Sequence, residues 1–322
     1  MVSQMLSIVI PVYRNQESLA DLLATLSTLA HELRVSAGQT LEAVFVVDGS
    51  PDDSFALLNS QLPTASFASK LILHSRNFGS FAAIRTGLTA AAGEHFAVMA
   101  ADLQEPPGLM ALFFKALLAD ECDVVVGCRE KRDDAYLSRL ASSIFWRFYR
   151  AFVMREFPEN GVDIFGCNRQ FRDELIRLSE ANSSLIGLIF WLGYRRKEIF
   201  YHRQKRAHGR SAWTLAKKLN YLRDSVFSFT DLPIRLLSAF GLIGVLGSTI
   251  LGLIVVIAKI FGKIDVPGYA ATILTIIFFG GINAVGLGIV GAYAWRGFEN
   301  TKQRPLALVR MCRSFDGSQK GE

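Results

Sequence analysis

Short apolar runs alternate with helical patterns along the first two thirds of the chain. The apolar runs cover residues 7–12, 41–47, 70–74, 95–100 and 123–127. Each run is continuous enough to be a strand that is buried on both faces of a sheet. Helical periodicity fills the intervening residues 17–33, 54–60, 81–91 and 109–118. This alternation predicts parallel β–α units and therefore an α/β fold with a Rossmann-like, mostly parallel sheet.

Polar groups follow all five predicted strands at the point where each strand ends. They lie at residues 11–13, 48–50, 76–77, 102–104 and 127–129. Because open α/β sheets bind ligands beyond the carboxyl ends of their strands, we expect these groups to form one polar site. No GxGxxG follows the first strand and no GxxxxGK[ST] occurs, which disfavours a dinucleotide oxidoreductase and a P-loop NTPase.

The segment FAVMAADLQEPP, residues 96–107, carries the most informative chemistry. Its apolar strand is followed by an acid at Asp102 and by a side-chain carbonyl at Gln104. Mg²⁺ and Mn²⁺ take oxygen ligands and are usually shared between one or two protein groups and substrate phosphates. The segment therefore favours a divalent cation on Asp102 and Gln104. Its alternative interpretation is an ordinary buried strand followed by an acid, which is common in α/β proteins.

Two long uncharged runs follow the α/β part. Residues 236–258 and 266–295 hold no charged side chain, and each run exceeds the ~20 residues that a helix needs to cross a bilayer. The chain is 51% hydrophobic with a mean hydropathy of +0.28, too apolar for an ordinary soluble enzyme. We therefore expect two transmembrane helices, at about residues 236–258 and 268–295. We expect no signal peptide before the first strand.

The charges around these runs predict their orientation. The connector between them carries only Lys263 and Asp265, whereas the flanking segments are basic. The flanking basic residues are Arg223, Arg235, Arg296, Lys302, Arg304, Arg310 and Arg313. The positive-inside rule therefore predicts a two-helix hairpin with both termini and the α/β part in the cytoplasm. A net charge of +6 suits contact with anionic lipid, and no recognised motif supports nucleic-acid binding.

These patterns divide the chain into four expected parts. They are a catalytic domain at 1–210, an interfacial amphipathic helix at 211–233, the hairpin at 234–295 and a cytoplasmic tail at 296–322. Apolar residues recur at helical spacing in the second part, which we interpret as a helix in the headgroup layer rather than a core helix. Small residues four apart in both spans allow close helix contact, within the hairpin or between subunits of a homo-oligomer. They are Gly244, Ser248 and Gly252, then Ala284, Gly288 and Ala292.

The four cysteines are at positions 122, 128, 167 and 312. They show neither CxxC spacing nor histidine partners at zinc spacing. Together with a cytoplasmic catalytic part, this predicts reduced thiols rather than disulfides or a zinc site.

An ordered set of segments resembles the membrane-anchored family 2 glycosyltransferases that load a sugar onto a polyprenyl phosphate. This group includes dolichol-phosphate mannose synthases and GtrB-type undecaprenyl-phosphate glucosyltransferases. The segments are SIVIPVYRNQESL, VVDGSPDDS, RNFGSFAAIRTGL, AADLQEPP, GCREKRDD, SRLASSIFWR, RAHGRSAW and ENTKQRP, together with both spans. The resemblance implies a GT-A fold, inverting transfer from a UDP-hexose to undecaprenyl phosphate, and a bacterial inner-membrane location.

The resemblance also implies roles for individual residues. The nucleotide sugar would be bound by Pro11, Tyr13, Asn15, Asp48, Asp102, Arg206 and Ser211. The cation on the diphosphate, Mg²⁺ or Mn²⁺, would be held by Asp102 and Gln104. The acceptor phosphate would be bound by Arg129, Arg139 and Ser143. Asp163 would lie close to the reacting sugar, so that Asp102, Asp163 and Arg129 form the catalytic group.

Simpler roles stay open for several of these residues. Tyr13 is alternatively a packed aromatic, Arg139 a solvated or lipid-facing residue, and Asp163 a residue that holds a loop. Ser143 is alternatively a residue that caps a turn of helix. The chain also departs from the family pattern at three positions, where an acid, an acid and a lysine are replaced by Val47, Ala100 and Ala212.

Because Ala100 replaces the first acid of D-x-D, a second hypothesis is a membrane scaffold that binds a nucleotide sugar with impaired transfer. A processive polysaccharide synthase is weaker, since no QxxRW-like segment occurs and two spans are few for a polymer channel. We expect a transferase that moves a hexose, with glucose as the first candidate. GlcNAc, aminoarabinose-type and mannose donors remain alternatives.

Overall fold

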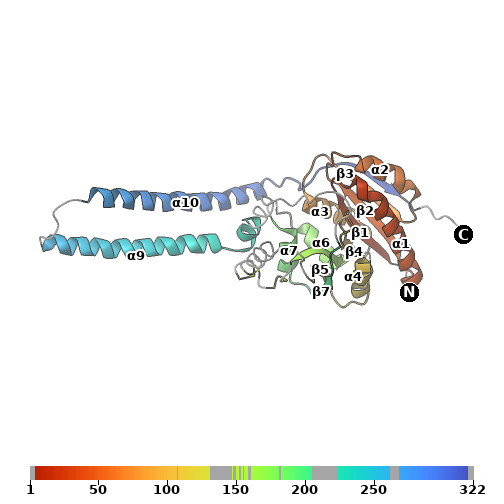
Figure 1. Cartoon of the computed structure of the whole chain (residues 1–322), viewed down its shortest axis with the longest axis horizontal. Helices are drawn as coiled ribbons and strands as arrows, with labels where there is room; N and C mark the ends of the chain where they lie inside the picture. The colour runs from red at the N-terminus through yellow and green to blue at the C-terminus, as the bar shows by residue number, and fades with distance from the viewer. Residues whose placement is uncertain are drawn as a thin grey trace.

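The computed structural model describes residues 4–106, 108–130, 147, 150–151, 154, 156–158, 161–180, 183–204, 223–261 and 268–317. These residues form an α/β domain from which two long helices extend (Figure 1). The expected site residues Arg139, Ser143, Arg206 and Ser211 lie outside the described residues, as does Ala212. So does most of the expected interfacial helix, of which 223–229 is described and helical.

The sheet has eight strands in the order β7-β5-β6-β4-β1-β2-β3-β8. They are β1 (Met5–Val12), β2 (Thr40–Val47), β3 (Ala68–His74), β4 (His95–Val98), β5 (Val124–Arg129), β6 (Val162–Asn168), β7 (Arg196–Tyr201) and β8 (Val309–Phe315). Among the described strands, only β6 and β8 run antiparallel to their neighbours. The predicted mostly parallel α/β fold is confirmed. All five predicted strands are present, while the sequence patterns missed β6, β7 and β8.

Helices cover both faces of the sheet (Figure 1). One face carries α1 (Leu19–Ala37), α2 (Ser54–Gln61) and α4 (Gly108–Leu118), and the other carries α3 (Ser80–Ala90), α6 (Arg169–Arg177) and α7 (Leu185–Trp191). In β1, Ile8 and Ile10 pack toward the first set and Val9 toward the second, all with no exposed surface. Burial on both faces explains why these strands have continuous apolar runs instead of alternating ones.

The antiparallel direction of β6 decides which of its residues reach the polar edge of the sheet. Val162, at the start of β6, pairs with Cys128 near the end of β5, and Gly166 pairs with Ala97 of β4. The start of β6 therefore lies beside the carboxyl ends of its neighbours. β7 is parallel to β5 and ends there too, with Tyr201 opposite Arg129.

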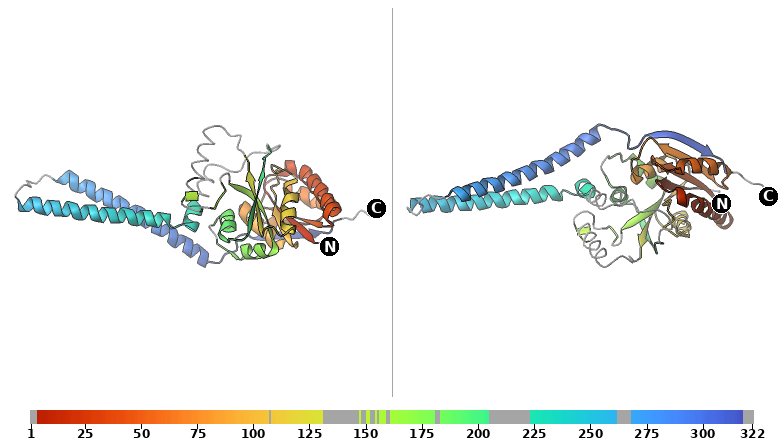
Figure 2. Two further views of the ribbon diagram at one scale, coloured as in Figure 1. Left: turned by 90° about the horizontal axis from the view of Figure 1, so that it is seen from below. Right: turned by 45° about the horizontal axis from the view of Figure 1, so that its top comes forward.

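α9 (Leu232–Ile260) and α10 (Tyr269–Thr301) lie side by side and project away from the domain (Figures 1 and 2). Gly244 faces Phe279 of the other helix, and Gly286 faces Leu237. Of the predicted small residues, Gly244 thus lies in the helix–helix contact, whereas a Cβ added at Gly252 or Gly288 would meet no atom of the described residues within 4 Å. The expected association into a homo-oligomer stays a prediction.

The surface of the two long helices is apolar and exposed. Its large exposed side chains include Leu242, Ile243, Leu246, Ile250, Leu253 and Ile254 of α9. Within the described part of the chain, Phe278–Thr301 is long and apolar enough to cross a membrane. The helices Arg223–Phe229 and Leu232–Gly244, bent by 80° at their junction, pass the same criterion together. An apolar surface of this extent indicates membrane association, and two complete crossings stay a prediction.

The segment after α10 returns to the sheet instead of forming a simple tail. β8 pairs with β3, with Cys312 opposite Ile72, and becomes the edge strand. Arg310 and Arg313 lie on this edge strand, a position at which charged residues prevent pairing with other chains. Of the four cysteines, all of which are free, only Cys312 is exposed.

Candidate active site

The connection between β4 and α4 carries the two predicted cation ligands. The residue between them, Leu103, has a φ of +53°. This left-handed backbone costs a non-glycine residue roughly 1–2 kcal/mol and is found preferentially at functional sites. It bends the chain tightly between Asp102 and Gln104, and the Gln104 N–H donates to Asp102 Oδ1 at 3.4 Å.

The segment that follows β7 is tied to Gln104. The Gln204 N–H donates to the Gln104 carbonyl at 2.9 Å, and Arg203 donates from Nη2 to Gln104 Oε1. The Gln104 amide in turn donates to the Gln204 carbonyl at 3.4 Å. The candidate cation site is therefore joined to the chain that leads into residues 205–222. The sequence patterns did not indicate Arg203.

Glu105 is a buried acid beside this turn. It is 2% exposed, and its Oε2 has no hydrogen-bond partner within the described residues. Burial, and then the negative charges of Asp102 and Asp163, raise the pKa of Glu105 to about 7, although Arg203 opposes the shift. Asp102 and Asp163 are thus both close enough to Glu105 to affect its pKa. Sequence reasoning missed Glu105, even though it belongs to the quoted AADLQEPP segment.

Arg129, Asp163 and Tyr201 form a cluster at the same edge of the sheet. Arg129 donates to both oxygens of Asp163, from Nε to Oδ2 and from Nη2 to Oδ1, the latter at 2.7 Å. The Tyr201 hydroxyl donates to Asp163 Oδ2 at 2.9 Å. Burial alone would lower the pKa of Arg129, but the hydrogen bonds and charge of Asp163 raise it. Arg129 is therefore a permanent cation and Asp163 its bidentate partner.

Tyr201 was not found from the sequence, because nothing in it marked the strand that carries this residue. Burial and the charge of Asp163 raise the pKa of the Tyr201 hydroxyl. The hydroxyl therefore stays protonated and keeps its role as a donor to Asp163.

Asp48 is buried at the end of β2 and organises the loop between β3 and α3. Its Oδ1 accepts from the Phe78 N–H and contacts His74 Nδ1, each at 2.8 Å, and its Oδ2 accepts from the Gly79 N–H at 2.7 Å. The next residue, Gly49, has a φ of +58°, and an added Cβ would lie 2.3 Å from the Arg76 carbonyl carbon. Only glycine fits that close approach. Direct contact of Asp48 with a nucleotide stays a prediction.

The loop after β1 is joined to the loop after β2. The Arg14 N–H donates to Ser50 Oγ at 2.8 Å, and the Gln16 N–H donates to Asp52 Oδ2 at 3.1 Å. Asn15 accepts through Oδ1 from the Tyr13 N–H at 3.0 Å. Tyr13 is partly exposed, with the Arg14 guanidinium 5.5 Å from the centre of its ring. This partial exposure argues against the alternative in which Tyr13 is a packed aromatic.

The predicted residues therefore fall into two adjoining groups. Asp102, Gln104, Arg129 and Asp163 lie together around Glu105. The other group is at the ends of β1 and β2 and comprises Pro11, Tyr13, Asn15 and Asp48. The two groups are linked by Ser18, whose hydroxyl donates to the Ala101 carbonyl at 2.8 Å.

The oxygen donors of Asp102 and Gln104 fit a hard divalent cation. Within the described residues, no group of three or more His, Cys, Asp or Glu side chains is arranged to hold a metal ion. A site with two protein ligands suits Mg²⁺ or Mn²⁺ when phosphates and water supply the remaining ligands. Ala100, which stands where the family usually has the first acid of D-x-D, is only partly buried. To bind the cation, Gln104 Oε1 would have to give up the hydrogen bond that it accepts from Arg203.

Comparison with known proteins places this site in a family. Residues 7–178 match the model of glycosyl transferase family 2. The chain belongs to this family. It is thus an inverting family 2 glycosyltransferase with the GT-A fold.

Among the relatives of this glycosyltransferase is the putative glycosyltransferase CsbB of Bacillus subtilis. It is 35% identical over 269 residues, which cover 84% of this chain and 81% of the relative. The undecaprenyl-phosphate 4-deoxy-4-formamido-L-arabinose transferase of an Enterobacter species is 31% identical over 312 residues, covering 94% and 92%. A solved structure of glucosyl-3-phosphoglycerate synthase from Mycobacterium tuberculosis, with Mn²⁺ and UDP-glucose, is similar at 15% identity and a TM-score of 0.47. That alignment covers 70% of this chain and 77% of the other.

Proposed function

We propose that this glycosyltransferase moves a hexose, with glucose as the first candidate, from a UDP-sugar to undecaprenyl phosphate. The reaction takes place at the cytoplasmic face of the inner membrane and gives a lipid-linked sugar for cell-envelope glycans. One observation carries the proposal: the oxygen ligands and the Arg129–Asp163–Tyr201 cluster share one edge of a sheet whose domain bears an apolar helical pair. The Enterobacter relative, named for undecaprenyl phosphate, supports the acceptor class.

On the donor side, Asp102 and Gln104 would hold the divalent cation against the diphosphate. The cation would supply charge neutralisation for the departing nucleoside diphosphate. Arg203 adds a guanidinium at the same place, because it already contacts Gln104. Pro11, Tyr13, Asn15 and Asp48 would bind the nucleoside, on loops that are fixed to each other by hydrogen bonds. Arg206 and Ser211 would close over the phosphates.

On the acceptor side, the nucleophile needs little activation. A phosphate monoester is largely doubly ionised near neutral pH, because its second pKa is about 6. Its oxygen can therefore attack without a strong general base, and the protein lowers the barrier by positioning and by charge stabilisation. Arg129, with Arg139 and Ser143, would bind this phosphate. Asp163, held by Arg129 and Tyr201, would orient the reacting sugar.

The identity of the sugar is the least constrained part of the proposal. The named relatives include transferases of a formamido-arabinose, so a different nucleotide sugar is the first alternative. The second alternative is a scaffold that binds a nucleotide sugar, and the loss of an acid at Ala100 favours it. The two differ in turnover, since the scaffold would bind UDP and transfer no sugar.

A transfer assay tests the proposal. Membranes that contain the protein are incubated with labelled UDP-glucose, and the lipid is extracted with solvent. We expect label in the lipid fraction, with a requirement for Mg²⁺ or Mn²⁺ and loss of transfer in Asp102→Ala. If Asp102→Ala labels lipid as well as the wild type does, the proposed cation site is wrong.

A further inference from the structure

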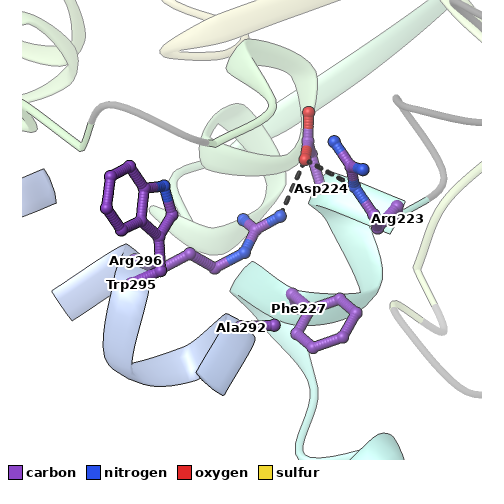
Figure 3. Close-up of a pocket in the computed structure, with 6 residues that line it drawn as sticks. All are labelled: Arg223, Asp224, Phe227, Ala292, Trp295 and Arg296. Carbon is purple, nitrogen blue, oxygen red and sulfur yellow. Dashed lines mark hydrogen bonds and ion pairs between the residues drawn. The ribbon is translucent and has the colours of Figure 1, made fainter. Parts of the chain in front are cut away.

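A pocket lies where the helical pair meets the catalytic domain. It has a volume of about 300 Å³ and is lined by Arg223, Asp224, Phe227, Ala292, Trp295 and Arg296 (Figure 3). This is the lower end of the size range of ligand pockets. Its two arginines come from different elements, the short helix Arg223–Phe229 and α10.

Among the described residues that line this pocket, two are arginines and one is an aspartate. Arg296 donates from Nη2 to Asp224 Oδ1 at 2.7 Å, and Arg223 Nε lies 3.7 Å from the same oxygen. Within the described residues, the Asp224 carboxylate thus faces two guanidinium groups (Figure 3). Guanidinium groups bind phosphate oxygens with planar, bidentate geometry, so the pair suits a phosphate ester that shares them with Asp224.

The pocket is held in place from both sides. Phe229 of the short helix packs against Gly187 of α7, where an added Cβ would lie 2.4 Å from the Phe229 ring. On the α10 side, the Tyr293 hydroxyl donates to the Thr230 carbonyl at 3.1 Å, and the rings of Phe227 and Tyr293 are 5.1 Å apart. These contacts fix the two elements that carry Arg223 and Arg296 relative to each other.

The position of the pocket along the helices corresponds to the membrane surface. The exposed apolar side chains of α10 give way there to Trp295, Arg296 and Lys302. Lys302 Nζ lies 5.0 Å from the centre of the Trp295 ring and 4.5 Å from that of Phe298. Aromatic and basic residues gather at this level of membrane proteins. The lining of the pocket combines the apolar residues Phe227, Ala292 and Trp295 with the charged residues Arg223, Asp224 and Arg296.

We propose that this pocket binds the phosphodiester headgroup of an anionic phospholipid and thereby fixes the catalytic domain against the membrane. The arginines bind the phosphate, and the apolar residues of the lining contact the glycerol and the first part of the acyl chains. Zwitterionic lipid binds less well, because its ammonium group meets two guanidinium groups. The proposal rests on the membrane location of the helical pair, but it does not depend on which sugar is transferred.

The test measures lipid binding by the full-length protein in a non-ionic detergent, using native mass spectrometry. Phosphatidylglycerol, phosphatidylcholine, undecaprenyl phosphate and inorganic phosphate are titrated separately. We expect phosphatidylglycerol to bind about tenfold more tightly than phosphatidylcholine, which corresponds to about 1.4 kcal/mol. Tighter binding of undecaprenyl phosphate at this pocket would overturn the proposal and assign the pocket to the acceptor. Binding of inorganic phosphate as tight as that of the lipid would overturn it as well.

Variants separate a specific pocket from general charge. Arg296→Gln and Arg223→Gln should each abolish most of the preference for phosphatidylglycerol. Asp224→Asn should increase the preference for phosphatidylglycerol, because the carboxylate that competes for the arginines is removed. If Asp224 were only a partner in a structural ion pair, the same substitution would weaken lipid binding. The control is Arg235→Gln, which removes a neighbouring exposed charge paired with Asp231. Equal losses in Arg235→Gln and Arg223→Gln would overturn the proposal.

Sugar transfer is measured on the same samples in detergent without phospholipid. Arg223→Gln should retain the wild-type rate there, because this residue lies outside the transfer site. If the wild type transfers no sugar but still prefers phosphatidylglycerol, the proposed function fails and the lipid site stands. Because Arg296 also makes structural contacts, the more exposed Arg223 gives the decisive result if Arg296→Gln does not fold.

Discussion

Arg129 binds both carboxylate oxygens of Asp163, across the ends of β5 and β6. The two residues lie 34 positions apart in the chain, and the antiparallel direction of β6 brings them together. In this state the pair is internally neutral. An incoming acceptor phosphate would therefore compete with Asp163 for Arg129, which ties acceptor binding to the orientation of Asp163.

Arg129→Ala should raise the KM for undecaprenyl phosphate by about tenfold or more, because a charge-assisted hydrogen bond contributes roughly 1.5–3 kcal/mol. The affinity for the UDP-sugar should stay within about twofold. Steady-state kinetics with each substrate varied in turn measure both values. Equal loss of nucleotide binding would reject this division of roles.

Arg195→Ala is the matched control for Arg129. Arg195 makes a similar pair with Asp123, with Nη2 at 3.0 Å from Oδ1, but at the opposite end of β5. Its removal should lower the Tm without a change in the KM for the acceptor.

Tyr201→Phe should lower kcat while the KM values change little. The substitution removes only the hydrogen bond to Asp163, which has a net value of about 1 kcal/mol for stability, so the Tm should fall by a few degrees. Thermal unfolding and kcat are measured on the same preparation, with Tyr194→Phe as the control. A lower Tm with an unchanged kcat would show that Tyr201 has a structural role alone.

Glu105→Gln should stabilise the protein more at pH 8 than at pH 5. Since the pKa of Glu105 in the folded state is raised to about 7, its neutral form is favoured by folding. Its stabilising effect is complete below the unfolded pKa, which is about 4.5, and is lost as the pH rises through about 7. The full effect is roughly 3 to 4 kcal/mol, from 1.36 kcal/mol per pKa unit.

Denaturant unfolding in EDTA at the two pH values measures this difference for Glu105→Gln and the wild type. EDTA is needed because a bound cation would itself favour the charged form. An equal difference at both pH values would contradict the assignment of Glu105 as the buried titrating acid.

Asp48→Asn should destabilise the protein by roughly 2–4 kcal/mol, because one buried oxygen acceptor becomes an amide donor. The new NH₂ group would face the Phe78 N–H, the Gly79 N–H or His74, all of which now contact the carboxylate. Asp53→Asn, at an exposed position that precedes α2 and makes no side-chain cap hydrogen bond, should change the stability by less than about 0.5 kcal/mol. Similar Tm values for the two variants would refute the structural role of Asp48.

The parallel core could be predicted from sequence because its strands are buried on both faces. Runs such as residues 41–47 have no charge except Glu42, and they stand out from their surroundings. β7 and β8 could not be found this way, since they lie at the two edges of the sheet and carry charges such as Lys197 and Arg310. An edge strand meets solvent, so its pattern resembles that of a loop.

The candidate site was predictable where a residue follows a recognisable strand, as Asp102 and Gln104 do. Tyr201 and Arg203 depend on the pairing of β7 with β5, which the local sequence does not encode. Glu105 belongs to the AADLQEPP segment, but its raised pKa comes mainly from burial, which the sequence does not show. A charged side chain in a polar segment is normally expected to face solvent.

The most direct test of the central claim is a panel of nucleotide sugars, incubated with purified protein, undecaprenyl phosphate and Mg²⁺ or Mn²⁺, with mass spectrometry of the lipid. The account predicts a new lipid whose mass is increased by one hexose, formed from a UDP-sugar and absent with EDTA or in Asp102→Ala. Binding of UDP without a mass increase for any donor would contradict it.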